Sequence, residues 1–293
     1  MESTVTQLLA RRRFAVVLRT FAVREQDVPK RVEMVKATID KIMALKPNPF
    51  CKILVVVWGD PNYIQPADCG LTAEALRRGI DPTNRIVGVV EFTHGDLFCG
   101  LLNWSIASLL RDRVDYGLIL SPDAHSYLTQ GVVDRMLQAI CDGAKVMGLA
   151  INELTELTHR GRIANTFAMW HLVSLMAVGG FDLTAQLPRG DKEAKFMRGC
   201  DPDGKVVYYP LAGVEEVIPL ARLVEVFGTC IIAPIDPDAV AKYIVPDPIS
   251  DPDGYLRYLS KMGTKEYRQN SLLAEKGYDP SYLQGGVMVG YPK

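Results

Sequence analysis

The chain has 293 residues, of which 48% are hydrophobic and 23% charged, and its formal net charge is -1 at pH 7. This length allows one large domain or two smaller ones, and the composition is that of an ordinary water-soluble globular protein. A net charge so close to zero creates no overall field that attracts nucleic acid or an anionic membrane, so we expect neither as a partner.

The sequence carries no signal for export or membrane insertion. In the opening MESTVTQLLARRR the basic run follows a short apolar patch, which reverses the order of a secretory signal. No stretch reaches the roughly 20 apolar residues that span a bilayer. The six cysteines form no CxxC pair, which favours reduced core thiols. We therefore predict a cytoplasmic protein without a transmembrane segment.

Strands and helices alternate through the first half of the chain. Continuous apolar runs predict buried strands at 14–18, 53–58, 86–90, 116–120 and 145–151. Apolar residues at helical spacing predict helices at 28–45, 71–78, 97–111 and 132–141. This alternation predicts an α/β fold with a mostly parallel sheet flanked by helices.

The pattern changes beyond residue 153. We predict a loop at 158–165, a mostly apolar helix at 167–177, a charged excursion at 184–204, a helix at 214–227 and a short strand at 230–233. Asp-Pro pairs recur from 235 onwards, so we divide the chain into a main domain, 1–235, and a C-terminal extension, 236–293, that packs on it. The tyrosines of this extension fit either a cover over a ligand or a homodimer contact.

The loop after the strand at 116–120 carries Asp123-Ala124-His125. In an open parallel sheet, ligands bind at the carboxyl ends of the strands. A carboxylate and an imidazole two residues apart suit Mn²⁺, Mg²⁺ or Zn²⁺. The alternative is an Asx-turn at Asp123, with His125 packed or facing solvent.

Two further segments carry candidate residues, the GVEE segment (213–216) and the GGFD segment (179–182). A carboxylate at the start of a helix either acts as a general base or only stabilises the first turn. A glycine pair after a helix either admits a ligand close to the backbone or forms a left-handed cap. Trp170 is either a ligand contact or a core residue. The chain has no GxGxxG, GxxxxGK[ST], GxSxG or HExxH pattern, which weakens the dinucleotide, P-loop, hydrolase and zincin interpretations.

The order of these features resembles that of the GT-A glycosyltransferases. A first strand ending in a polar pair, a second ending in Asp60, a helix carrying Asn103, the Asp-x-His loop, the GGFD segment and the GVEE segment follow one another over residues 14–233. The similarity is closest to the large inverting family that contains cellulose- and chitin-synthase-like enzymes. It implies a GT-A-like fold and the transfer of a sugar from a nucleotide-diphosphate donor to an acceptor hydroxyl.

The resemblance also implies a substrate site. Its substrate-binding residues would be Arg19, Thr20, Asp60, Asn103, Trp170, Gly180 and Asp182. The first three would line the nucleotide, and the GGFD segment would lie near the donor sugar and the acceptor.

The same resemblance implies the metal-binding residues and the general base. Asp123 and His125 occupy the place of the family's DxD motif, so Mn²⁺ or Mg²⁺ would bridge the diphosphate as a Lewis acid. Glu216, or as the less favoured choice Glu215, would take the acceptor proton. A base at Glu216 would favour inversion by direct displacement, while the stereochemical outcome stays open between inverting and retaining.

The chain departs from the family pattern in ways that support a second hypothesis. No histidine follows His171 as a third metal ligand, which leaves Asp236 or Asp238, and Leu102 stands where the family has arginine. These departures support a non-catalytic nucleotide-sugar-binding or scaffold protein with the same fold. A nucleotidyltransferase is disfavoured because residues 19–22, after the first strand, contain no glycine for a phosphate loop.

Overall fold

The computed structural model describes residues 4–21, 28–58, 66–79, 86–92, 98–148, 163, 165–186, 198–200, 206–208, 214–227, 232–234, 247–250, 252, 255 and 265–279. Of the predicted site residues, Asp60 lies outside these ranges, as do the two alternative metal ligands Asp236 and Asp238.

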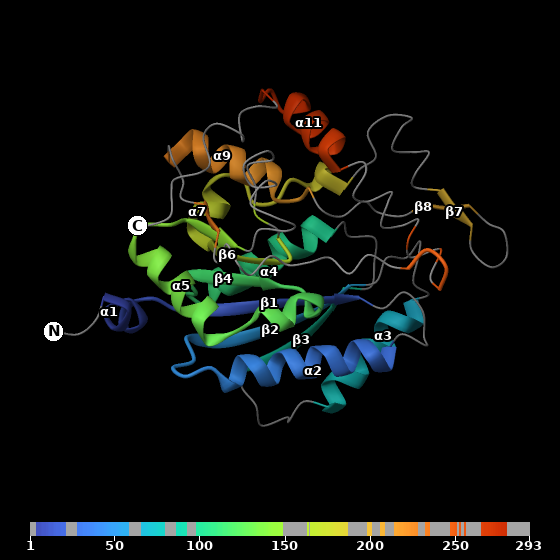
Figure 1. Cartoon of the computed structure of the whole chain (residues 1–293), viewed down its shortest axis with the longest axis horizontal. Coiled ribbons are helices and arrows are strands. Elements are labelled where there is room, and N and C mark those ends of the chain that lie inside the picture. Colours follow the sequence, from blue (N-terminus) through green and yellow to red (C-terminus); the bar gives the residue numbers. More distant parts are fainter. Residues whose placement is uncertain are drawn as a thin grey trace.

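A seven-stranded sheet forms the centre of the protein, in the order β3-β2-β1-β4-β6-β5-β9 (Figure 1). The strands are β1 (Phe14–Phe21), β2 (Phe50–Trp58), β3 (Val87–Phe92), β4 (Tyr116–Leu120), β5 (Val146–Gly148), β6 (Phe167–His171) and β9 (Ile232–Pro234). Neighbouring strands are parallel except at β6, which is antiparallel to both β4 and β5. Two short strands, β7 (Arg198–Cys200) and β8 (Val206–Tyr208), form a separate antiparallel pair.

Helices cover both faces of the sheet (Figure 1). One face packs against α1 (Thr4–Arg11), α2 (Val28–Ala44), α3 (Pro66–Gly79) and α5 (Gln130–Cys141). The other packs against α4 (Phe98–Arg111), α7 (Leu172–Ala177), α9 (Val217–Phe227) and α11 (Lys265–Glu275). We call these the α2 face and the α4 face.

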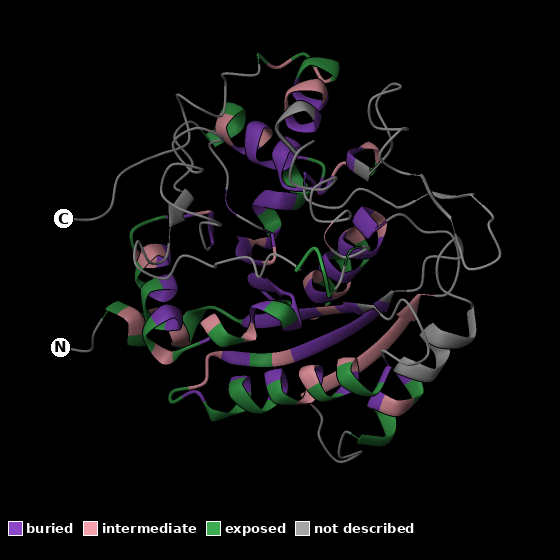
Figure 2. Ribbon diagram, turned by 45° about the vertical axis from the view of Figure 1, so that its right-hand side comes forward, coloured by how far each residue is buried: buried purple, intermediate pink, exposed green. Residues whose placement is uncertain are grey.

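Alternation along β1 separates the two cores. Val16 and Leu18 point to the α2 face, whereas Ala15 and Val17 point to the α4 face. Buried residues follow the strands and the helix sides that face them, while the outer helix sides are exposed (Figure 2). The sheet is therefore covered on both faces, which explains why its strands read as continuous apolar runs.

The register brings the ends of two strands to one edge. Leu18 of β1 lies beside Leu120, the last residue of β4. β1 continues past this point along β2, with Arg19 beside Val56 and Thr20 beside Val57. Arg19 and Thr20 thus lie where β4 has already ended, at the carboxyl edge where an open α/β sheet binds ligands.

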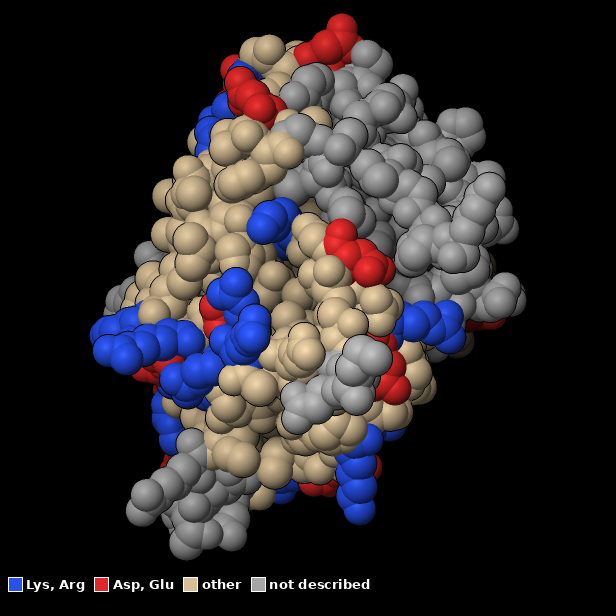
Figure 3. Space-filling view, turned by 90° about the vertical axis from the view of Figure 1, so that its left-hand side faces the viewer, with Lys and Arg blue, Asp and Glu red and all other residues tan. Residues whose placement is uncertain are grey.

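The opposite, amino edge of the sheet carries a mixture of charges (Figure 3). Arg12 forms an ion pair with Asp115 at 2.9 Å, and Lys52 pairs with Asp112. Arg13 donates through its backbone to the Asp115 carboxylate and through its guanidinium to the Asp112 carbonyl, both at 2.8 Å. Part of the N-terminal arginine run therefore holds α1 and β1 to the start of β4.

The predicted α/β class and mostly parallel sheet are confirmed, but the predicted helix at 167–177 is wrong. Residues 167–171 form strand β6, and only 172–177 are helical. Phe167 to Trp170 are all buried because β6 lies between two strands and under helices on both faces. A short run of this kind has no period that separates a buried strand from a buried helix.

Helix α11 packs on the α4 face of the sheet. Leu272 and Leu273 of α11 are fully buried in the cluster that also contains α4 and α9. Within the described ranges, no helix has the length and apolar character needed to cross a bilayer.

Candidate functional site

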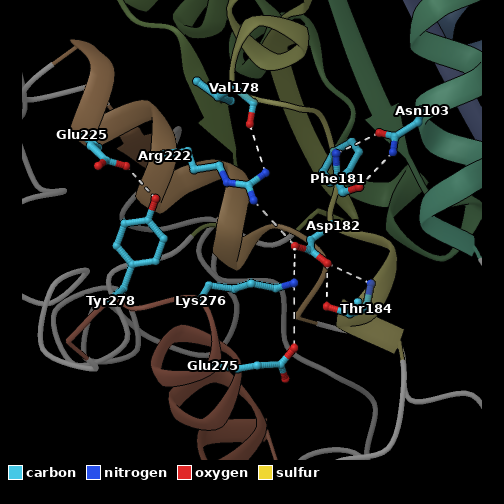
Figure 4. Close-up of polar contacts among 10 residues, drawn as sticks. All are labelled: Asn103, Val178, Phe181, Asp182, Thr184, Arg222, Glu225, Glu275, Lys276 and Tyr278. Carbon is cyan, nitrogen blue, oxygen red and sulfur yellow. Dashed lines mark hydrogen bonds and ion pairs between the residues drawn. The ribbon is translucent and has the colours of Figure 1, made fainter.

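The GGFD segment ends α7 and is fixed by Asn103 of α4 (Figure 4). Gly179 and Gly180 both have positive φ, of 94° and 69°, which glycine adopts without steric cost. The Asn103 side chain accepts a hydrogen bond from the Phe181 N–H and donates one to the Phe181 carbonyl, each at 2.8 Å. A Cβ on Gly180 would lie 2.6 Å from Asn103 Oδ1. Both the turn and the asparagine contact therefore require glycine at 180.

Asp182 is held by groups from three parts of the chain (Figure 4). Its carboxylate accepts hydrogen bonds from the Thr184 N–H at 2.8 Å and the Thr184 hydroxyl at 2.6 Å. Lys276 Nζ lies 3.1 Å from Asp182 Oδ2, and Arg222 Nη2 lies 3.8 Å from the same oxygen. Burial by itself raises the pKa of Asp182, but the hydrogen bonds from Thr184 and the nearby Lys276 outweigh it and hold that pKa below its ordinary value.

The two glutamates of the GVEE segment are buried just before α9. Glu215 and Glu216 are 3% and 2% exposed. Arg19 Nη1 lies 3.9 Å from Glu215 Oε1, and the Arg19 guanidinium stacks over the ring of Phe98, 4.7 Å from its centroid. Arg19 follows Ala15 and Val17 on the α4 face of β1, which is why it meets α4 and the GVEE segment.

The buried thiol of Cys99 is influenced by the charged groups of all these segments. Cys99 lies in the first turn of α4, and burial raises the pKa of its thiol well above the ordinary value. The charges of Glu215, Asp182 and Glu216 raise that pKa further, whereas Arg19 lowers it. Three carboxylates and an arginine from separate segments thus act on one buried position at the start of α4. We call Arg19, Asp182, Glu215 and Glu216 the α4-face cluster.

Asp123 and His125 lie at the same edge of the sheet but face α2. They belong to a 3-10 helix, η2 (Pro122–Tyr127), directly after β4. The Asp123 carboxylate is 3.2 Å from Arg31 Nη1 and accepts a hydrogen bond from the Ser121 hydroxyl at 3.0 Å. The predicted site residues are therefore divided between the two sides of the sheet.

His125 has the tautomer expected of a metal ligand. Its Nδ1 lies 2.7 Å from the Pro122 carbonyl, which can only accept, so Nδ1 carries a proton and Nε2 is the nitrogen that a metal would bind. Asp123 is 55% exposed, but a cation at its carboxylate competes with Arg31. Among the described residues, no three His, Cys, Asp or Glu side chains form a group able to hold a metal ion. Asp123 and His125 therefore fit as two donors that need further ligands from a substrate, from water or from residues outside the described ranges.

Two other predicted contacts have different surroundings. Trp170 is fully buried, its Nε1 donates to Asn165 at 3.1 Å, and its ring packs edge-on against Phe181. Trp170 is thus a core residue, as the alternative interpretation expected. Its ring contact with Phe181 supports the GGFD segment. Thr20 is 3% exposed, points to the α2 face, and has no hydrogen-bond partner for its hydroxyl among the described residues.

The sequence did not reveal Arg222 and Lys276 as part of this arrangement. Arg222 lies on α9, where its Nη1 also donates to the Val178 carbonyl at 3.1 Å, and Lys276 follows the last turn of α11. Neither belongs to a recognisable motif. The only signal in the sequence was Asp182 itself. The GGFD segment holds no basic residue to pair with this carboxylate, so a cation had to come from another part of the chain.

Comparisons with known proteins show no relative from which a role can be taken. No family model matches the chain, and no curated protein matches its sequence. Among solved structures, the chain is similar to a cytidylyltransferase from Leptospira borgpetersenii serovar Hardjo-bovis (strain JB197), with a TM-score of 0.45 and 11% identity. That similarity covers 96% of this chain and 100% of the other.

Proposed function

We propose that the protein is a glycosyltransferase that moves a sugar from a nucleotide-diphosphate donor to an acceptor hydroxyl. The observation that carries the proposal is the convergence of the strand end at Arg19, the GGFD segment and the GVEE segment at the carboxyl edge of β1, on the α4 face. These segments are far apart in the sequence, and their order is the one that resembles the GT-A enzymes. Buried carboxylates beside an arginine at this edge also suit proton transfer.

Glu216 is the proposed general base. Glu215 Oε1 lies 3.9 Å from Arg19 Nη1, so the charge of Glu215 balances the guanidinium. Glu216, the carboxylate at the position that resembles the family's base, would accept the proton of the acceptor hydroxyl. The acceptor oxygen then forms a bond to the anomeric carbon while the bond from that carbon to the diphosphate oxygen breaks, with the electron pair leaving on the diphosphate. A displacement of this kind inverts the anomeric centre.

A divalent cation, Mn²⁺ or Mg²⁺, is proposed at Asp123 and His125. When bound, it would neutralise charge on the diphosphate as a Lewis acid. The His125 tautomer supports this assignment, and the Arg31 ion pair is the contact that a metal would have to replace. The nucleotide would then lie across the end of β1, with Arg19 on one side and Thr20 on the other.

A non-catalytic nucleotide-sugar-binding or scaffold protein remains the second candidate. The observation that favours it is that two predicted ligand groups are already engaged within the protein, Asp123 by Arg31 and Asp182 by Lys276. Ion pairs of this kind occur at positions that only stabilise a fold, which is what a non-catalytic protein would retain. They also occur in active sites before the ligand binds.

The experiment has two stages. Thermal shifts with UDP, GDP, CDP and dTDP, each with and without Mn²⁺, identify the nucleotide, because a ligand at one hundred times its Kd stabilises by about 2.7 kcal/mol. Sugar derivatives of that nucleotide are then tested for hydrolysis and transfer. We expect Glu216→Gln to lower turnover by roughly 100-fold or more with the nucleotide shift unchanged. The matched control Glu33→Gln, on the exposed side of α2, should leave both unchanged.

The outcomes separate the candidates. Turnover that survives in Glu216→Gln removes Glu216 as the base. A nucleotide shift without turnover of any donor sugar favours the scaffold. The absence of both rejects nucleotide-sugar binding altogether.

A further inference from the structure

The position of Lys276 is fixed by the end of α11. The helix closes with Gly277 at a φ of 82°, and the Tyr278 N–H bonds back to the Leu273 carbonyl at 2.9 Å. Leu272 and Leu273, one turn earlier, are fully buried in the cluster that also contains residues of α4 and α9. This capped end therefore delivers the lysine to one place without depending on the lysine itself.

The same turn also contacts α9. The Tyr278 hydroxyl donates to Glu225 at 2.7 Å, and burial, followed by this contact with Glu225, raises the pKa of Tyr278 to about 12. Figure 4 shows Asp182 reached by Thr184 from its own segment, by Arg222 from α9 and by Lys276 from the end of α11. The GGFD segment is thus tied to two helices that follow it much later in the sequence.

The residues that fix the position of Asp182 differ from the residue that balances its charge at the shortest distance. Thr184 supplies two hydrogen bonds that fix the Asp182 carboxylate locally, and Asn103 fixes the backbone before it. Arg222 is already engaged at the Val178 carbonyl. What Lys276 adds is a positive charge 3.1 Å from Asp182, beside a cluster with three carboxylates.

We propose that Lys276 is a positioning residue of the candidate active site: it acts through Asp182, whose charge it balances at 3.1 Å within the α4-face cluster. This inference rests on the proposed function. Removing Lys276 takes one positive charge away from the surroundings of the α4-face cluster, which favours protonation of its carboxylates. A general base in that cluster would then require a higher pH to work.

Two cations lie at the Asp182 carboxylate, Arg222 of α9 and Lys276 after α11. The charges of Arg19, Glu215 and Glu216 act together with that of Asp182 on the buried Cys99 at the start of α4. Arg268 is a further buried cation on α11. Glu275, 3.8 Å from Lys276 Nζ, is the other acidic contact of the lysine. Removing Lys276 changes this balance in one direction only.

The test uses the full chain with Lys276→Met, Lys276→Gln and Lys276→Arg, and Lys30→Met on the exposed side of α2 as the control. The first readout is a ¹³C NMR titration of the Asp182 carboxyl, assigned with Asp182→Asn. We expect a higher midpoint in the Met and Gln variants and a wild-type midpoint in the Arg and control variants. The Gln variant keeps the test valid if the Met variant does not fold.

The second readout is the pH profile of turnover with the donor identified by thermal shift. The acid limb should move to higher pH in the Met and Gln variants and return in the Arg variant. An unchanged midpoint, or a changed midpoint with an unchanged acid limb, overturns the positioning role. If the wild-type chain turns over no donor, the proposed function is wrong. The NMR titration does not need turnover, so it still tests whether Lys276 balances the charge of Asp182.

Discussion

Asp123 and Arg31 form an ion pair, with 3.2 Å between Oδ1 and Nη1, at the very position where the sequence predicts a metal. The pair connects the loop after β4 to α2 and turns the carboxylate away from the α4-face cluster. Both side chains keep contact with solvent, so the pair contributes about 0–1 kcal/mol and can be replaced.

Arg31→Met therefore tests the metal site. Because the guanidinium no longer competes for Asp123, we expect Mn²⁺ to bind up to about fivefold more tightly than to wild type, the equivalent of about 1 kcal/mol. Electron paramagnetic resonance of free Mn²⁺ during a titration measures this. Asp123→Asn should abolish the gain in the double variant. Equal affinity in wild type and Asp123→Asn would mean that Asp123 does not bind the metal.

Asn103→Ala should destabilise the protein by about 2–3 kcal/mol. The substitution leaves both the N–H and the carbonyl of the buried residue Phe181 without their side-chain partner. Urea unfolding at pH 7 gives the value. Gln138→Ala is the control, because it removes an exposed side-chain bond to Asp142 and should cost less than about 0.5 kcal/mol.

A series of three glycine substitutions separates backbone strain from steric clash. Gly131→Ala meets no atom within 4 Å and should be neutral or slightly stabilising. Gly143→Ala also meets open space but has a φ of 95°, so it should cost about 1–2 kcal/mol. Gly180→Ala combines a φ of 69° with an approach of 2.6 Å to Asn103 Oδ1, and we expect about 3 kcal/mol or more. Equal costs at 143 and 180 would show that Asn103 moves aside.

The stability of the protein should fall between pH 7 and pH 5 because of His171. Burial, followed by the charges of Lys145 and Arg12, lowers the pKa of His171 from the ordinary 6.5. The unfolded chain then binds a proton at a higher pH than the folded protein does, so stability is lost as the pH falls through 6.5 towards the folded value.

His171→Asn should remove this loss. His171 is the N-cap of α7, and asparagine keeps an oxygen that can accept from the Ser174 N–H. Thermal unfolding of both proteins from pH 7 to pH 5 should therefore show a smaller decrease for the variant. A parallel decrease in the two proteins would assign the pH dependence to other groups.

The sequence is sufficient for much of the fold because burial on both faces makes each strand a continuous apolar run and each helix amphipathic. It fails at 167–177, where β6 and α7 share one apolar stretch without a distinguishing period. The reversed direction of β6 leaves no local signal either, since it depends on pairing with β4 and β5.

The candidate site shows the same limit at the level of side chains. The sequence places Arg19 and Asp123 at the carboxyl edge of a sheet, and the resemblance adds Glu216 from the start of a helix. The side of the sheet to which each one turns depends on the loops that connect these elements. The period-two alternation of β1 does assign Arg19 to the same face as Val17, so the side of the sheet that Arg19 reaches could be predicted from the sequence. The link between Asp182 and Lys276 was not, because it joins two isolated charges through the fold alone.

The contact between Asn103 and Phe181 has a consequence for motion. One side chain pairs both polar groups of a backbone position, as a neighbouring strand would. We therefore expect α4 and the GGFD segment to move as one unit. Any closure of the site around a ligand must leave this unit intact. The displacement therefore falls on its neighbours, and hydrogen exchange should find the amides of α4 and residues 180–181 among the slowest in the protein.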